Sequence, residues 1–321
     1  MARTYYFSVI FLFLLVFTVF FPFFPLSAAP AKKCTGCARR IRGTYFTMKG
    51  KTYCSKSCLE NALPKCSVCR KTLERYMQSP VTGMKYCENC AAKPKCFFCG
   101  DVAGNGAGYR ITEQMLLCRS CRNTSVSNTG KAYSLFTLIR NQLKQRLGTG
   151  TDHIISFHLT TYPVLQRKLS GSSHVPRTGQ TGLYECQTLT RTEKKVDVRT
   201  GKTVASRVSS VRKKHFIYIL SSLPDAEYRH AVVHELTHDW LGEYYPRLND
   251  PKIQEGVCEY MAYLFLEEER KKDTGVRLAL ARMENNPDPV YGEGFRFICK
   301  IAGQGDRKTR LERVKNFLAK R

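Results

Sequence analysis

Acidic residues are scarce in this sequence. Asp and Glu together number 26 against 52 Lys and Arg, so the formal net charge is +26 at pH 7. This balance excludes a generally acidic surface and favours acidic partners, namely nucleic acid, anionic lipid or acidic protein. The sequence also lacks an aromatic-rich nucleic-acid module, and its basic residues are scattered, so nucleic acid is not an expected partner. A basic surface over one or two domains with a sizeable core is the simplest interpretation of the 321 residues.

Cysteine, by contrast, is abundant in the first third of the chain, where twelve of the 15 cysteines form six close pairs. A Cys-x-x-Cys turn places two thiolates on one metal, and a second pair returned by a loop completes a tetrahedral zinc site. Disulfides are the alternative in an exported chain, but they would not explain a spacing that occurs three times. The sequence therefore predicts three structural zinc sites, with the ligands Cys34, Cys37, Cys54 and Cys58; Cys66, Cys69, Cys87 and Cys90; and Cys96, Cys99, Cys118 and Cys121.

The catalytic signal is a His-Glu-Leu-Thr-His motif at 234–238. His234 and His238 are four residues apart, so on a helix both imidazoles share a face and can bind one Zn²⁺, with Glu235 beside them as general base. Glu255 on the next predicted helix is the candidate third ligand. Glu259 is expected to orient a ligand imidazole, although the two glutamates could exchange roles. Two imidazoles and one carboxylate leave a position open for water, and the predicted chemistry is peptide-bond hydrolysis.

Other residues near this motif are assigned lesser roles. His230 and His238 lie about 12 Å apart along a helix at 1.5 Å per residue, so both cannot bind one ion, and His230 is expected on the helix surface or supporting a ligand. Cys258 is expected to be a small core residue. Tyr260 and Tyr291 are candidates for stabilising the developing oxyanion.

Periodicity and turn residues predict the elements around the motif. A helix is expected at 135–147, a strand at 154–159, and strands at 183–190 and 214–220 with a basic, hairpin-like region between them. That region is interpreted as a solvated face, with an acidic substrate or a lipid surface as the alternative. A capping box at 222–225 is expected to open the metal-binding helix, and the second helix should run from Pro251 to about Lys272. The strand Phe216–Leu220 could line the cleft as a substrate-binding edge.

Residues 5–25 are almost wholly apolar and are followed by small residues up to Ala31. This arrangement predicts a signal peptide over residues 1–31, cleaved after Ala29 or Ala31, or an uncleaved membrane anchor. The expected location is therefore exported, meaning periplasmic, lumenal or extracellular, or membrane-anchored, with the membrane as a partner through residues 5–25.

Three motifs together resemble one family: His-Glu-x-x-His-x-Trp at 234–240, Glu-Gly-x-Cys-x-x-x-Ala at 255–262 and Tyr-Gly-x-Gly-Phe-Arg at 291–296. With the cysteine modules, they are similar to the LIM-domain-containing, ubiquitin-activated peptidases that restrict organ growth in plants, and to their bacterial-type relatives. The local pattern also resembles gluzincins, zinc peptidases whose third ligand is a Glu on the following helix. The resemblance implies an α+β fold, in which tandem LIM-like modules precede a gluzincin-like metallopeptidase domain with a mixed or antiparallel sheet.

These inferences give one predicted organisation. A signal peptide or anchor (1–31) precedes three Cys₄ zinc modules (32–125) and a zinc metallopeptidase domain (126–321). The chain is expected to bind one catalytic and three structural Zn²⁺ ions, to hydrolyse a protein or peptide substrate, and to bind a protein partner through the zinc modules. The alternative is a catalytically inactive zinc-finger adaptor, free or held to a membrane. Activation by ubiquitin is not expected, because no ubiquitin-interacting segment precedes the modules in this sequence.

Overall fold

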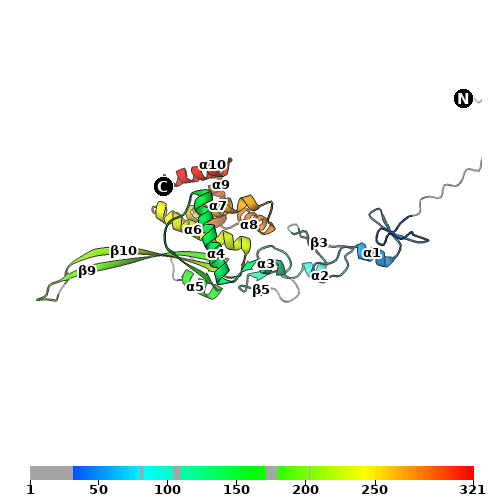
Figure 1. Ribbon diagram of the computed structural model, residues 1–321, viewed down its shortest axis with the longest axis horizontal. Helices are drawn as coiled ribbons and strands as arrows, with labels where there is room; N and C mark the ends of the chain where they lie inside the picture. The colour runs from blue at the N-terminus through cyan, green and yellow to red at the C-terminus, as the bar shows by residue number, and fades with distance from the viewer. Residues whose placement is uncertain (1–31, 80–81, 104–108, 171–178, 202) are drawn as a thin grey trace, which may run out of the picture. The chain divides into compact units, whose positions relative to one another are not determined.

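The computed structural model describes residues 32–79, 82–103, 109–170, 179–201 and 203–321 (Figure 1). The chain divides into two compact units, one ending at Leu63 and the other running from Pro64 to Arg321. Helices and strands both contribute, so the expected α+β class is confirmed. The signal peptide or anchor predicted at 1–31 lies outside the described residues.

The first unit holds the first cysteine module. An antiparallel hairpin of β1 (Phe46–Met48) and β2 (Lys51–Tyr53) leads into helix α1 (Lys56–Ala62). Ser55 caps this helix, because its side chain accepts a hydrogen bond from the backbone N–H of Cys58. The turn between hairpin and helix thereby brings Cys54 and Cys58 close together.

The second unit begins with two modules of the same design, each a short hairpin followed by a short helix. In the second module these are β3 (Met77–Gln78), β4 (Lys85–Tyr86) and α2 (Glu88–Ala91), and in the third they are β5 (Tyr109–Arg110), β6 (Leu116–Leu117) and α3 (Arg119–Asn123). The second module packs mostly on itself in a small cluster that Val102 completes. The third module instead contributes Phe98, Met115 and Leu117 to the large core of the following helices and strands.

The rest of the second unit is built around a three-stranded mixed sheet. Its strands are β8 (Ile155–Thr160), β9 (Gly182–Val196) and β10 (Thr203–Leu220), in the order β8-β10-β9. Strand β10 is parallel to β8 and antiparallel to β9, so the prediction of a mixed or antiparallel sheet is confirmed. The expectation that Phe216–Leu220 forms the edge is wrong, since this segment pairs on both sides. The edge strand near the predicted catalytic helix is β9.

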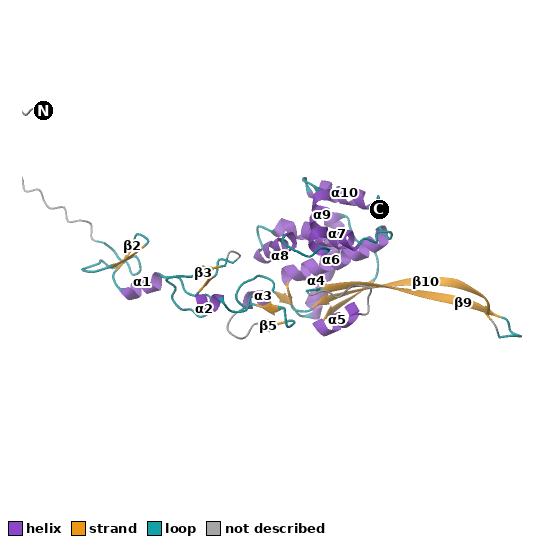
Figure 2. Ribbon diagram, turned by 180° about the vertical axis from the view of Figure 1, so that it is seen from behind, coloured by secondary structure: helices purple, strands orange, loops and turns teal. Residues whose placement is uncertain are grey.

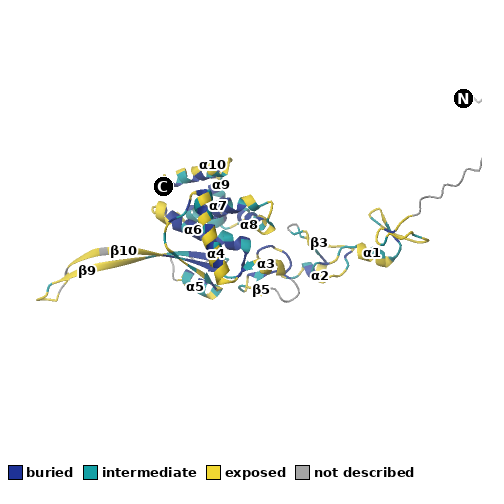
Figure 3. Cartoon of the chain, in the orientation of Figure 1, coloured by how far each residue is buried: buried dark blue, intermediate teal, exposed yellow. Residues whose placement is uncertain are grey.

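Helices cover both sides of this sheet (Figure 2). Helix α5 (Tyr162–Ser170) lies on one side, and α4 (Thr129–Leu147) and α6 (Asp225–Tyr244) lie on the other (Figures 1 and 2). Beyond α6 follow α7 (Pro251–Leu266), a 3₁₀ turn (Glu267–Glu269), α8 (Thr274–Glu284), α9 (Tyr291–Ala302) and α10 (Arg307–Leu318). Figure 3 shows the buried residues concentrated where these helices meet the sheet.

Three helix boundaries differ from those expected, the first being that of α4, which begins at Thr129 and not at residue 135. No capping box opens α6, because Leu223–Pro224 forms strand β11, paired with β7 (Ser125–Val126), and the helix begins only at Asp225. Ser222 is buried with φ +69°, and its hydroxyl lies 3.2 Å from that of Tyr109 instead of capping the helix. Helix α7 ends at Leu266 rather than near Lys272, because three consecutive glutamates follow in a 3₁₀ turn. Strand pairing with distant β7 thus overrides the local helix signal.

Two glycines allow α7 and α9 to cross at backbone contact. A Cβ atom on Gly256 would overlap the backbone of Gly294, and a Cβ atom on Gly294 would overlap the carbonyl oxygen of Lys252. Only hydrogen fits at either position, which explains a glycine in each of the two motifs at 255–262 and 291–296. This contact also fixes the rotation of α7, on which Glu255 and Glu259 lie.

Replacing Gly256 with Ala should destabilise the second unit. The added methyl group must separate α7 from α9, and overpacking of this kind costs about 1–3 kcal/mol. We expect the urea midpoint of unfolding to fall accordingly. Gly242→Ala is the matched control, because a Cβ atom on this exposed residue of α6 meets nothing within 4 Å; it should stabilise the helix by about 0.5–1 kcal/mol. Equal stability of the two variants would contradict the role of the close crossing.

Candidate metal centres and active-site cleft

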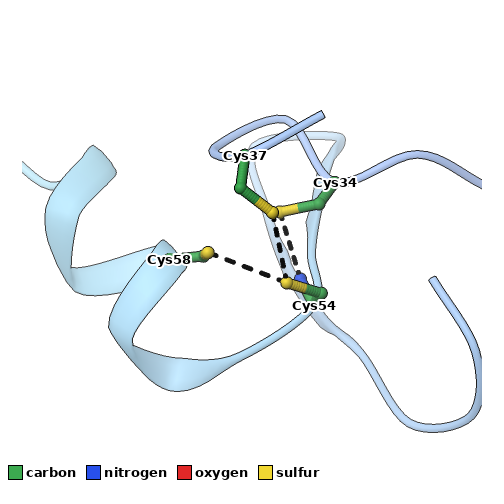
Figure 4. A group of neighbouring side chains, drawn as sticks. All are labelled: Cys34, Cys37, Cys54 and Cys58. Carbon is green, nitrogen blue, oxygen red and sulfur yellow. Dashed lines mark hydrogen bonds between the residues drawn. The ribbon is translucent and has the colours of Figure 1, made fainter. Parts of the chain in front are cut away.

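The three predicted cysteine sets are each brought together in the structure, with donor atoms close enough to hold a metal ion. In the first set, the sulfur of Cys54 lies 3.6 Å from that of Cys37 and 3.7 Å from that of Cys58 (Figure 4). The corresponding sulfur distances are 3.8 Å for Cys69–Cys87 and 3.6 Å for Cys99–Cys118. A tetrahedral site with Zn–S bonds of about 2.3 Å has S···S edges of about 3.8 Å. The three clusters could therefore bind zinc.

Disulfides do not account for these clusters. All 15 cysteines are free thiols, and the sulfur separations are far beyond the S–S bond length of about 2.05 Å. The backbone N–H of Cys54 donates to the sulfur of Cys34, and this hydrogen bond lowers the pKa of the Cys34 thiol to about 6. A thiolate at neutral pH is the form that binds zinc.

The histidine motif lies in the middle of α6, against α7. His234 Nε2 lies 3.0 Å from Oε2 of Glu255, and His238 Nε2 lies 3.4 Å from the same oxygen. His234 Nδ1 lies 3.1 Å from Oε1 of Glu259. Thus the Glu255 carboxylate faces both Nε2 atoms, and the Glu259 carboxylate holds the opposite nitrogen of His234. The four side chains are largely buried.

Pairing with imidazoles keeps both carboxylates of this cluster ionised. Burial opposes the ionisation of Glu255, but hydrogen bonds with His234 and His238 outweigh it, so the pKa of this carboxyl lies well below its ordinary value. Burial likewise opposes ionisation of Glu259, and the charges and hydrogen bonds of His230 and His234 again hold its pKa low. Two ionised carboxylates and converging imidazole nitrogens in a buried site form a donor set that suits Zn²⁺.

Glu235 faces the edge strand of the sheet. A Cβ atom on Gly182 of β9 would lie only 2.5 Å from Oε1 of Glu235, so a glycine is required there. The backbone N–H of Tyr184 donates to the Glu235 carboxylate, but burial dominates and raises the pKa of Glu235 above its ordinary value. A carboxyl group whose pKa is raised towards neutrality can take up and release a proton during catalysis.

A cleft of about 680 Å³ opens over these residues. Its walls include the start of β9, the loop before α9, and the turn Phe97–Gly100 of the third cysteine module. The Phe97 side chain is 39% exposed. Its ring lies beside Gly179, just before β9, where an added Cβ atom would be 3.6 Å from the Phe97 Cζ atom. No local pattern indicated that this module borders the cleft, because about 80 residues separate its turn from the start of β9.

The other residues singled out from the sequence occupy different positions around the histidine cluster. His230 contacts Glu259, with Nε2 3.1 Å from the carboxylate, and lies away from Glu255. Tyr291 lines the cleft and stacks with the His234 ring at a centroid distance of 5.9 Å, whereas Tyr260 is buried against Phe295. Cys258 is completely buried, yet its sulfur lies within 4.8 Å of donor atoms of His234 and His238.

A second buried cluster, to which the sequence assigned no role, surrounds Asp239. Its Oδ1 atom lies 2.8 Å from His153 Nδ1, 3.0 Å from His215 Nδ1 and 3.1 Å from the hydroxyl of Tyr184. The two imidazole rings stack at 3.9 Å with an angle of 17° between their planes. Their in-plane lone pairs cannot converge on one ion in this arrangement. The cluster is instead a hydrogen-bonded brace that ties α6 to β9, β10 and the segment before β8.

Comparison with known proteins gives one family match and several plant relatives. A family model described as DA1-like (Protein DA1) matches residues 165–281, from α5 to α8. The LIM domain-containing protein HDR3 of Oryza sativa subsp. japonica is 28% identical over 257 residues, 74% of this chain and 51% of HDR3. Protein DA1 of Arabidopsis thaliana is 25% identical over 310 residues, 82% of this chain and 58% of that protein. The chain thus spans about half the length of these relatives. No solved structure matches significantly.

The predicted exported or membrane-anchored location is contradicted by these comparisons. The matched relatives are plant proteins of the LIM-domain and DA1 type, and among the described residues no helix is both long and apolar enough to cross a bilayer. The apolar segment at 5–25, on which the signal peptide or anchor depended, lies outside the described residues. That prediction rested on the apolar run and on the small residues that follow it, and similarity to these plant proteins overturns it.

The relatives also refine the resemblance drawn from the motifs. They show similarity to DA1-like proteins, one of which is named for its LIM domains, and they do not support a bacterial-type gluzincin relative. The family match includes the His-Glu-Leu-Thr-His helix and the helix that carries Glu255. Residues 165–281 thus match the DA1-like family model, and similarity to HDR3 and Protein DA1 extends over 74% and 82% of the chain.

Proposed function

We propose that this protein is a zinc-dependent peptidase that hydrolyses peptide bonds of protein substrates. The observation that carries the proposal is the convergence of Glu255 Oε2 with the Nε2 atoms of His234 and His238, beside Glu235 at the wall of a cleft. His234, His238 and Glu255 would hold the catalytic zinc. Glu259 would orient His234 through its Nδ1 atom.

The chain's own groups have distinct tasks in this reaction. Zinc, when bound, supplies Lewis acidity that polarises the scissile carbonyl and lowers the pKa of water towards 7. Glu235 takes the proton from the attacking water and delivers it to the leaving amine. An extended substrate adds to the free edge of β9 near Gly182 through backbone hydrogen bonds. Tyr291, the only one of the two candidate tyrosines that lines the cleft, is the candidate donor to the developing oxyanion.

We place the peptidase domain at residues 126–321 and propose that the third cysteine module, which precedes it, forms one wall of its cleft. Phe98 and Cys99 belong to the same hydrophobic core as α6 and α7. The Phe98 ring also packs against the guanidinium group of Arg282, 5.3 Å away, which pairs with Glu227 on α6. Zinc in this module would therefore help to shape the cleft. Its four thiolate ligands would fill the metal's coordination and leave no position for a catalytic water.

The adaptor function remains the second candidate, and exposed apolar side chains on the first two modules favour it. Each module presents large hydrophobic residues to solvent: Tyr45 and Phe46 in the first, Tyr76, Met77 and Met84 in the second. Exposed aromatic residues and methionines are enriched where proteins bind partners. We propose that these two modules bind protein partners, either beside a functional peptidase or, in the alternative, as the sole activity.

Zinc content tests the metal assignment. The purified chain should bind about four zinc ions under reducing conditions, and a His234→Ala/His238→Ala variant should bind about three, because only the site between α6 and α7 is lost. Inductively coupled plasma mass spectrometry measures the ratio. His158→Ala, which removes an exposed histidine on β8, is the control and should keep four. Three ions in all proteins would show that the histidine motif binds no metal.

Glu235→Gln should retain zinc and lose turnover. The amide cannot accept the proton of the attacking water, and general-base catalysis contributes roughly 10²- to 10⁴-fold. Cleavage of an unstructured peptide mixture, followed by mass spectrometry, gives the rate. Glu312→Gln, an exposed change on α10, should leave cleavage unchanged. Full activity of Glu235→Gln would reject the mechanism, and no cleavage by the unmodified chain would favour the adaptor.

Matched cysteine variants separate the roles of the zinc modules. Cys58→Ser and Cys121→Ser each remove the last thiolate of a module. Both should lower zinc content by about one ion, but only Cys121→Ser should reduce peptide cleavage, because only the third module borders the cleft. Equal loss of cleavage in both variants, or in neither, would contradict the role of the third module as a wall of the cleft.

A further inference from the structure

The second unit carries a long two-stranded arm. Strands β9 and β10 continue beyond the covered part of the sheet as a ribbon that projects away from the helices (Figures 1 and 2). We define the arm as residues 188–214. Every arm side chain that the structure describes within the two strands is exposed (Figure 3). An uncovered two-stranded ribbon gains little stability from burial, so the arm is best explained by what it binds.

The arm is strongly basic. It contains two acidic residues, Glu193 and Asp197, and nine basic residues: Arg191, Lys194, Lys195, Arg199, Lys202, Arg207, Arg212, Lys213 and Lys214. The register places Lys195 opposite Ala205 and Arg212 opposite Leu189, so no carboxylate faces these two residues across the ribbon. Glu193 lies opposite Arg207, but the large excess of basic residues still gives a net positive field that attracts an acidic partner.

Strand register places three of the basic residues on one face, together with Glu193, whereas Lys194 and Lys213 lie on the opposite face. The side chains of residues 189, 193 and 195 in β9 point to the same face of the ribbon, because successive side chains of a strand alternate between its two faces. Their partners in β10, namely Arg212, Arg207 and Ala205, lie on that face as well. Lys195, Arg207 and Arg212 therefore share one face. The opposite face presents exposed valines, including Val208 and Val211 at 54% and 57% exposure. Apolar side chains beside a basic face suit a peptide better than a nucleic-acid backbone, which offers phosphates and sugars alone.

The arm is continuous with the substrate edge of the cleft. Its strand β9 begins at Gly182 beside Glu235, and the described residues place no strand on the free edge of β9. A peptide that pairs with this edge at Tyr184 can continue along the same strand. At about 3.3 Å per residue, the register positions of Arg212 and Lys195, five and eleven residues beyond Tyr184, lie about 17 and 36 Å from that point.

We propose that the arm is a docking surface for an acidic segment of the protein substrate, bound about 5–11 residues from the scissile peptide bond. This inference rests on the proposed peptidase function and adds the class of substrate to it. The residues of the cleft cleave any extended peptide that binds there. The arm selects protein chains that carry Asp or Glu about 5–11 residues from the scissile bond. The attraction is electrostatic and must weaken as salt screens it.

The test compares substrates that differ only far from the cleaved bond. A short peptide that the enzyme cleaves is extended, on its N-terminal or its C-terminal side, with either an acidic or a neutral block 5–11 residues away. One arm variant combines Lys195→Glu, Arg207→Glu and Arg212→Glu. Its control combines Lys271→Glu, Lys308→Glu and Lys320→Glu, three exposed residues outside the arm with the same change in net charge.

For one of the two extensions, N-terminal or C-terminal, we expect kcat/KM for the acidic substrate to be about tenfold higher than for its neutral counterpart. This preference should appear in both the unmodified enzyme and the control variant. The arm variant should lose this preference through KM, with unchanged cleavage of the short peptide. A neutral variant, Lys195→Gln with Arg207→Gln and Arg212→Gln, keeps the test valid if the charge-reversed ribbon is unstable. No acidic preference in the unmodified enzyme, or the same preference in the arm variants, would overturn the proposal.

Direct binding distinguishes this failure from failure of the proposed function. If the unmodified chain cleaves no peptide, fluorescence anisotropy of the labelled acidic and neutral peptides still tests the arm. Tighter binding of the acidic peptide that is lost in the arm variant would support the docking surface without catalysis. Binding of a single-stranded oligonucleotide that depends on the arm, with no binding of the acidic peptide, would assign the surface to nucleic acid and overturn the proposal.

Discussion

A buried cluster of imidazoles and carboxylates imposes the strictest constraint on this fold. Each buried ion loses hydration worth several kcal/mol, which only well-placed partners can offset. His234 contacts Glu255 through one nitrogen and Glu259 through the other, so the two glutamates must lie one turn apart on the same face of α7. A small rotation of α7 would leave one carboxylate without its partner. The relative position of α6 and α7 is therefore fixed by charge as much as by packing.

Contacts on the outer sides of α6 and α7 maintain the relative position of these two helices. On the α7 side, Gly256 and Gly294 let α9 approach to backbone contact. On the α6 side, Asp239 accepts hydrogen bonds from groups on β9, β10 and the segment before β8. Asp239 directly follows His238, so the brace acts on the residue next to a candidate ligand. The edge strand β9 is thereby attached to the same helix as the candidate catalytic residues.

Local spacing predicted part of this arrangement, and long-range pairing determined the rest. The cysteine sets and the face shared by His234 and His238 depend on separations within one turn or one loop, so the sequence sufficed to predict them. The edge strand was misassigned because the position of β9 outside β10 depends on pairing across the sheet. The capping box at 222–225 failed for the same reason, since β11 pairs with a strand nearly 100 residues earlier. His153, His215 and the cleft-lining turn of Phe97 carry no local signal at all.

Equal ligand spacing does not give the three cysteine modules equal roles. Metal binding contributes directly to folding free energy in small zinc modules. In the first module that contribution is confined to its own compact unit. In the third module, Cys96, Cys99 and Cys118 are buried in the core that includes α6 and α7, so a metal bound there would also stabilise the wall of the cleft. The hydrophobic residues beside the ligands, namely Phe98, Met115 and Leu117, create this difference. A zinc module becomes part of a neighbouring site when its own core is too small to close and is completed by another element.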